Sequence, residues 1–165
     1  MFKNPDKAPK RYTPGEALPK IAAYCAYQER TQKEVAEKLK SYGLDGDEAG
    51  EIIIRLGREK LLDEERYAQS YARGKHRTNG WGRRRIKLEM KAKGLSDYCI
   101  KSGLKELDGD EYYAKLQQLL EQRAAREKET HPMKRKMKLM AYLVQKGYES
   151  DLIQEALGEL PASDR

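Results

Sequence analysis

The sequence predicts an all-α protein, an elongated tandem array of three small three-helix units preceded by an extra N-terminal helix. No segment alternates apolar and polar residues as a half-buried strand does. Hydrophobic residues make up 38% and charged residues 37% of the 165 residues, so the core is thin and suits small helical units. An apolar pattern also recurs along the chain, which is typical of repeat proteins.

The repeat is anchored on three glycines, Gly43, Gly94 and Gly147, which are 51 and 53 residues apart. Apolar residues stand eight and four residues before each glycine, and ten and thirteen residues after it. In chain order these are Val35, Leu39, Ile53 and Leu56; Ile86, Met90, Leu104 and Leu107; and Leu139, Leu143, Leu157 and Leu160. Matches at all these offsets indicate one module copied three times.

Each module begins with a short helix that buries the residues eight and four before the glycine, because residues four apart share a helix face. The glycine then adopts the left-handed conformation that ends a helix, so we expect helix C-caps at Gly43, Gly94 and Gly147. A second helix follows and buries the residues ten and thirteen after the glycine. A third helix starts at an N-capping aspartate, Asp63 or Asp108.

These signals divide the chain. Residues 1–15 carry three prolines and several lysines, and we expect a disordered basic tail. Residues 16–30 form the extra helix, and Thr31 with Glu34 makes a capping box for the next one. The three repeats cover residues 31–76, 77–126 and 127–165. The last is short, and we expect it to lack its third helix.

Positive charge is concentrated in the first helices of the second and third repeats. Residues 75–94 contain eight Lys or Arg and one acid, and residues 131–146 contain five and none, whereas residues 44–65 contain three bases and eight acids. Arg84, Lys87 and Lys91 are spaced to form one stripe. The stripe suits contact with phosphate, and it equally describes an ordinary solvated face. Charge alone makes these residues candidates for facing a polyanion: Lys75, Arg77, Arg83, Arg84, Arg85, Lys87, Lys91, Lys134, Arg135 and Lys138.

Gly80, Trp81 and Gly82 form a glycine-rich segment that we interpret as a hinge between repeats. The single tryptophan of the chain either plugs the junction or anchors a partner. Because large aromatic side chains are mostly buried, we favour the plug.

Signs of catalysis are missing from the sequence. It has no glycine-rich phosphate loop, no metal-ligand cluster and no nucleophile next to a placed base, so we expect a binding protein without cofactor or metal. Cys25 and Cys99 have no metal-ligand spacing and are expected to be free thiols in a reducing compartment. No apolar run is long enough to span a bilayer, and no signal peptide is recognisable. We expect a monomer in the cytoplasm.

Three blocks resemble the regulatory protein RecX family. "YCAYQERTQKEVAEKLKSYGLD" is similar to the family's opening, with Glu29-Arg30-Thr31 in place of its Glu-Arg-Ser run. "LLDEERYAQSYAR" resembles its Leu-Asp-Asp-x-Arg-Phe-Ala block. "GWGRRRIKLEMKAKGL" resembles its Gly-x-x-x-Ile-x-x-Glu-Leu-x-x-Lys-Gly-Ile block. The likeness runs from about Leu18 to Leu160 and is weakest in the third repeat.

The resemblance implies a modulator of the RecA recombinase that is not an enzyme. Such proteins are three tandem three-helix repeats thought to lie in the groove of the RecA filament on single-stranded DNA, where they inhibit strand exchange, ATP hydrolysis and co-protease activity in DNA repair. The sequence leaves open whether the protein also binds free DNA weakly. The alternative is a stand-alone DNA-binding protein, a repressor or architectural factor, although no helix is rich in the Asn, Gln and Arg that read base edges. The sequence leaves open whether this chain inhibits or stimulates its partner.

Overall fold

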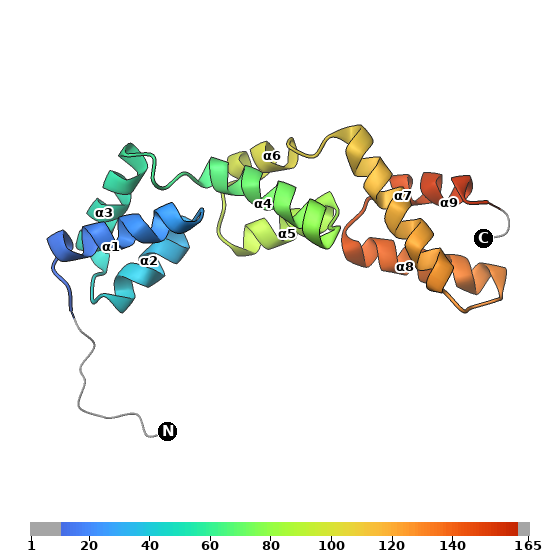
Figure 1. The fold of residues 1–165 in the computed structure, drawn as a ribbon, viewed down its shortest axis with the longest axis horizontal. Helices are drawn as coiled ribbons and strands as arrows, with labels where there is room; N and C mark the ends of the chain where they lie inside the picture. Colours follow the sequence, from blue (N-terminus) through green and yellow to red (C-terminus); the bar gives the residue numbers. More distant parts are fainter. Residues whose placement is uncertain (1–10, 162–165) are drawn as a thin grey trace, which may run out of the picture.

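A computed structural model describes residues 11–161 and contains nine α-helices and no strand over that range. Most of the predicted basic tail lies outside the described residues. The helices, shown in Figure 1, are α1 Pro14–Tyr27, α2 Gln32–Ser41, α3 Gly46–Arg58, α4 Glu64–Asn79, α5 Arg83–Ala92, α6 Asp97–Leu104, α7 Gly109–Arg126, α8 Pro132–Lys146 and α9 Ser150–Glu159.

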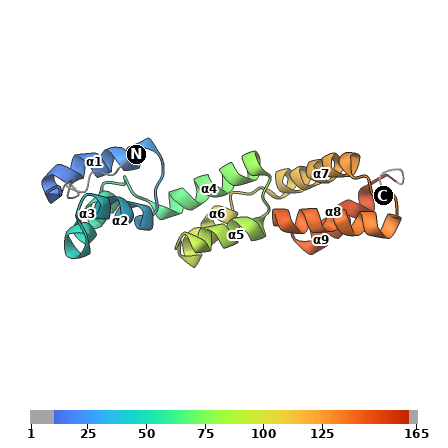
Figure 2. The same cartoon turned by 90° about the horizontal axis from the view of Figure 1, so that it is seen from below.

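The nine helices pack as three trios, α1–α3, α4–α6 and α7–α9, which we call units 1, 2 and 3. The trios follow one another along the long axis, so that α1 and α9 lie at opposite ends of the molecule (Figures 1 and 2). The all-α class and the elongated array of three three-helix units are therefore confirmed.

Each unit begins one helix earlier in the chain than the predicted repeat does. The helix predicted as an extra element is α1, which packs on α2 and α3, starts at Pro14 and completes unit 1. Likewise α4 packs on α6, so closely that a Cβ at Gly103 would lie 2.7 Å from the Ala68 carbonyl oxygen. The third unit, predicted to be truncated, is complete because α7 supplies its long helix. Residues 59–76 therefore belong with the second unit or its linker, and residues 109–126 with the third.

Local sequence explains most helix ends. Thr31 and Glu34 form the predicted capping box at the start of α2, and the carboxylates of Asp63 and Asp108 accept hydrogen bonds from backbone N–H groups at the starts of α4 and α7. The backbone φ angles of the three repeat glycines are 81° at position 43, 80° at 94 and 101° at 147, which is the left-handed region that favours glycine.

The first helix of each sequence repeat, now α2, α5 or α8, buries both predicted apolar residues. In units 1 and 2 the next helix is rotated relative to the prediction, because Ile53 and Leu104, ten residues after the glycine, are only half-buried. The equivalent Leu157 of unit 3 is buried as predicted. The positions buried in all three repeats lie six, nine and thirteen residues after the glycine, which is the i, i+3, i+7 spacing of one helix face. They are Ala49, Ile52 and Leu56; Ile100, Gly103 and Leu107; and Ile153, Ala156 and Leu160.

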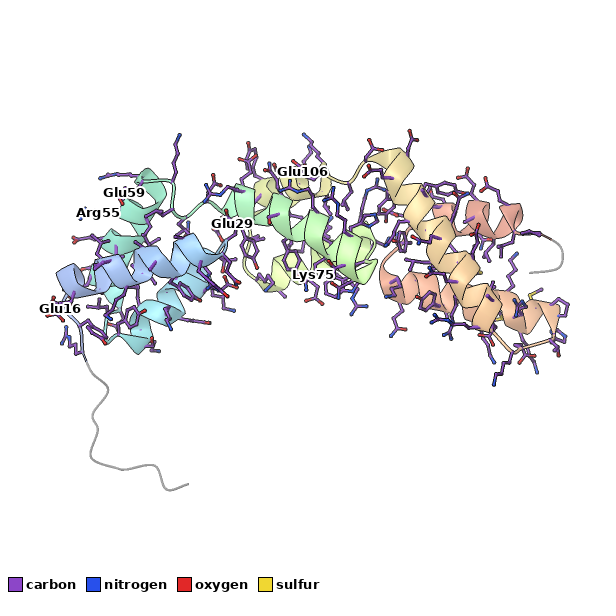
Figure 3. All side chains as sticks on the ribbon, in the orientation of Figure 1. Glu16, Glu29, Arg55, Glu59, Lys75 and Glu106 are labelled. Atoms are coloured by element: carbon purple, nitrogen blue, oxygen red, sulfur yellow. The ribbon has the colours of Figure 1, made fainter. Side chains whose placement is uncertain are left out.

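The described residues form two cores rather than three. Unit 1 and the linker after it have their own apolar cluster, whereas the buried residues of units 2 and 3 form one continuous cluster. The junction between units 1 and 2 is bridged by polar contacts. Arg66 Nε of α4 lies 2.6 Å from Glu29 Oε1, and Glu64 accepts a hydrogen bond from the backbone N–H of Gln32. Glu29 lies where the two units meet (Figure 3).

Candidate nucleic-acid and protein interface

The loop at residues 80–82 connects α4 to α5 inside unit 2 and docks on the loop between α8 and α9 of unit 3. It is therefore not the hinge between units that its glycines suggested. The Gly82 N–H donates to the Lys146 carbonyl oxygen at 2.8 Å, and the Arg84 N–H donates to the Gly147 carbonyl oxygen at 3.0 Å. A Cβ at Gly82 would lie 2.4 Å from the carbonyl group of Gly147. Glycine is required at position 82 because two backbones touch there.

Two buried tyrosines of unit 3 complete this junction. The Tyr148 hydroxyl donates to the Gly80 carbonyl oxygen at 3.0 Å. The Tyr112 hydroxyl accepts from the Arg83 N–H at 3.0 Å and donates to Glu149 Oε2 at 2.7 Å. Burial raises the pKa of both phenols, and the hydrogen bond to Glu149 raises that of Tyr112 further. Both therefore remain protonated donors.

Unit 3 thereby caps α5. Gly82 offers no capping side chain, and the first turn of α5 contains three arginines and no acid, an arrangement that opposes the helix dipole. Acceptors from unit 3 receive the N–H groups of Arg83 and Arg84, and Glu149 lies 3.3 Å from the Arg83 guanidinium. The N-terminus of α5 is thus satisfied by groups of unit 3.

Trp81 is half-buried and packs against the core that units 2 and 3 share. This position agrees with the interpretation of Trp81 as a plug rather than an exposed anchor. The Lys75 ammonium lies 5.1 Å from its ring centroid, and the Arg85 guanidinium lies 4.3 Å from it. These cation–π contacts hold two of the predicted cations near the middle of the array, where Figure 3 labels Lys75.

The predicted stripe on α5 faces two different hollows. Lys87 and Lys91 line a groove between α5 and α6, whereas Arg84 lines a cleft between α5 and α8. All three side chains are exposed. Because the first hollow lies within unit 2 and the second lies across the junction with unit 3, we treat them separately and call them the basic groove and the junction cleft.

The basic groove has a volume of about 540 Å³ and is strongly cationic. Its lining residues are Arg83, Lys87, Lys91, Asp97, Ile100, Lys101, Leu104 and Lys105. Arg83 is held by Glu149 and lies 3.8 Å from the centroid of the Tyr112 ring. The four lysines are exposed, and within residues 11–161 none has a carboxylate at ion-pair distance. Such a groove can accept a run of phosphates or carboxylates.

Lys101 and Lys105 were not among the sequence candidates. Lys101 lies on α6, and Lys105 directly follows the last residue of that helix, one turn further on. Both are outside the segment with the highest charge density, and only the packing of α6 beside α5 brings them to Lys87 and Lys91. The i, i+4 spacing of the two lysines is a weak signal that could have identified them.

The cations predicted in unit 3 are largely engaged within that unit. Lys138 pairs with Glu127 and Glu129 at 3.9 and 3.4 Å, and the Arg135 guanidinium donates to the carbonyl oxygens of Ala124 and Glu127 at the end of α7. Both acids lie just before residues 131–146, so the charge count for that segment did not include them and its lysine and arginine residues appeared unpaired. Lys134 is exposed on α8, and Arg77 is exposed at the end of α4.

Residues 11–161 contain no group of three or more His, Cys, Asp or Glu side chains placed to hold a metal ion, and none of their helices is long and apolar enough to cross a membrane. Cys25 is buried in α1 and Cys99 is half-buried in α6, and both are free thiols.

The fold and the groove define a tandem three-helix-repeat protein with a cationic central unit. Family models match each unit in turn: RecX, first three-helix domain, over residues 20–56; second three-helix domain, over 63–104; and third three-helix domain, over 110–157. The crystal structure of RecX from Lactobacillus salivarius is 30% identical, with a TM-score of 0.82, and the match covers 89% of this chain and 96% of that one. The chain belongs to the RecX family of regulatory proteins.

Curated relatives carry the same family name. Regulatory protein RecX of Mycobacterium sp. (strain KMS) is 28% identical over 98% of this chain and 90% of its own length. Regulatory protein RecX of Oceanobacillus iheyensis is 26% identical over 86% of this chain. The match covers 52% of the Oceanobacillus protein, so this chain spans about half the length of that relative.

Proposed function

We propose that this protein binds the RecA filament on single-stranded DNA in the cytoplasm and inhibits its recombinase, ATPase and co-protease activities during DNA repair. The observation that carries the proposal is the basic groove, in which five cations from α5, α6 and the residue after α6 surround one acid, in the middle unit of an elongated array (Figure 1). Membership of a family of regulatory proteins supports a regulatory role for this chain.

Phosphate is the ligand that best fits the groove. Among the described residues the four lysines have no carboxylate partner, so each can follow a phosphate without a fixed geometry, while Arg83 is held in place by Glu149 and Tyr112. Each phosphate that a lysine neutralises releases counterions, so the affinity falls as salt rises, with a slope of about −0.7 per contact for a single strand. Replacing two lysines by glutamate removes two contacts and adds two repulsive charges.

The test is the variant K87E/K91E in an assay of RecA's DNA-dependent ATPase. We expect the concentration for half inhibition to rise about tenfold or more, with an unchanged helical circular dichroism spectrum, because both side chains are exposed. The matched control is K33E/K40E, the same charge change at two exposed lysines of α2, outside the groove. Equal inhibition by both variants would contradict the role of the groove. An ATPase rate above that of RecA alone would instead identify a stimulator.

The alternative, a stand-alone repressor or architectural factor, requires side chains that read base edges. The exposed positions of α5 carry Arg, Lys, Leu and Ala, and the helix has no Asn or Gln. Gel retardation with wild-type protein distinguishes the two functions. We expect weak binding to DNA without sequence preference, whereas selective binding at physiological salt in the absence of RecA would favour the alternative.

A further inference from the structure

We propose that the junction cleft between α5 and α8 is a protein-docking site, which receives an aliphatic side chain flanked by a carboxylate from the protein component of the filament. This inference rests on the proposed function and assigns the contacts with DNA and with protein to two different surfaces. The basic groove holds phosphate, and the junction cleft holds protein.

The cleft exposes apolar surface from two units at once. Leu88 of α5 is 68% exposed and Val144 of α8 is 51% exposed, and both line the same hollow of about 420 Å³. A single exposed leucine needs no explanation, but two large aliphatic side chains that line one hollow are a common mark of an interaction site. A sugar–phosphate backbone offers no aliphatic side chain to cover them, so a protein segment is the matching occupant.

The charges around this apolar centre specify the partner further. Arg84 is exposed and has no carboxylate at ion-pair distance within residues 11–161. Arg85 lies over Trp81 and points one N–H toward the Gln145 carbonyl oxygen, 3.5 Å away, and Glu89 is the one acid in the lining. The positive balance complements an acidic segment, and an exposed guanidinium can form a bidentate pair with a carboxylate.

The two sides of the cleft are fixed relative to each other. Gly147 forms part of the lining, is buried, and its carbonyl oxygen accepts the hydrogen bond from the Arg84 N–H. Units 2 and 3 also share one core. A partner therefore has no need to order the site on binding, which lowers the cost of association. The equivalent glycine of unit 2, Gly94, is exposed and has no other group within 4 Å of an added Cβ, so the repeat alone does not create such a cleft.

The experiment compares L88S/V144S with the control I54S/Y98S, which removes two similarly exposed apolar residues of α3 and α6 away from the cleft. Affinity is measured twice, for RecA filaments on single-stranded DNA and for the same DNA without RecA. We expect the cleft variant to bind filaments about tenfold more weakly and to bind DNA normally, and the control to resemble wild type in both. R84E is expected to act like the cleft variant on filaments, and R84K to be milder.

Other results would overturn the inference. Filament binding by the cleft variant equal to that of the control would show that the cleft is not used, and an equal loss on bare DNA would assign it to nucleic acid. A wild-type dimer that the cleft variant dissociates, with filament binding intact, would assign it to a second copy of this chain. If wild-type protein fails to bind filaments at all, the proposed function itself fails, and the docking site with it.

Discussion

The replacement of Gly82 by alanine tests whether units 2 and 3 are joined as rigidly as the backbone contacts indicate. The added methyl group would lie 2.4 Å from the carbonyl carbon and oxygen of Gly147 and 2.6 Å from the backbone nitrogen of Tyr148. These are main-chain atoms of the α8–α9 loop, so no side chain can rotate out of the way. The α4–α5 loop and the α8–α9 loop must move apart.

The cost follows from the contacts that this separation breaks. Among the hydrogen bonds that cross the junction, three join the loop around Gly82 to the α8–α9 connection: the Gly82 N–H to Lys146, the Arg84 N–H to Gly147, and the Tyr148 hydroxyl to Gly80. Each contributes about 1 kcal/mol net, so the variant loses about 3 kcal/mol of unfolding free energy. That is a large part of the roughly 5–15 kcal/mol that stabilises an ordinary domain.

The assay is urea unfolding followed by circular dichroism and by the fluorescence of Trp81, the single tryptophan, which lies in the affected loop. The control is Gly74→Ala in the exposed interior of α4, where an added Cβ meets no other group within 4 Å. Alanine favours a helix over glycine by about 0.8–1 kcal/mol, so this control should be slightly more stable than wild type. If Gly82→Ala is as stable as the control, units 2 and 3 are not held by this contact.

Two further changes probe the same architecture. Tyr112→Phe removes the hydroxyl that the Arg83 N–H donates to and that donates to Glu149 Oε2, so we expect a loss of about 1–3 kcal/mol in chemical unfolding, with Tyr113→Phe as a half-buried comparison. Burial raises the pKa of Tyr67 to about 12. Since the folded protein then holds this proton more tightly than the unfolded chain does, stability should be full below about pH 10 and fall between about pH 10 and 12. Tyr67→Phe should flatten that fall, and an unchanged pH profile would contradict it.

Local sequence patterns predicted the helices and the residues at which several of them begin. The spacing of apolar residues identifies a helix face from neighbours three or four positions apart, and the capping residues Thr31, Asp63 and Asp108 act on N–H groups within three residues of themselves. These interactions are nearly complete within one helix turn. They therefore need no knowledge of how the helices pack, and the structure agrees with them.

The grouping of helices into units could not be predicted in the same way. The repeat period marks equivalent positions but does not say whether a long helix packs on the trio before it or after it. Contact surfaces decide this, through the small residues Ala68 and Gly103 that let α4 and α6 approach closely. The pattern also placed Ile53 and Leu104 on the buried face, since a helix with a wide apolar stripe can rotate by one position without breaking its periodicity.

The candidate interface could likewise be predicted from the sequence only in part. Net charge identified α5 as a cationic helix from its own residues, because charge density along a segment is visible without a fold. Only tertiary packing brought Lys101 beside Lys87 in one groove and paired Lys138 with two acids. Packing also placed Leu88 and Val144, which are 56 positions apart in the sequence, in the lining of the junction cleft. Helix formation depends on neighbours along the chain, whereas a binding surface depends on which distant helices share a boundary, and the shared core of units 2 and 3 sets that boundary.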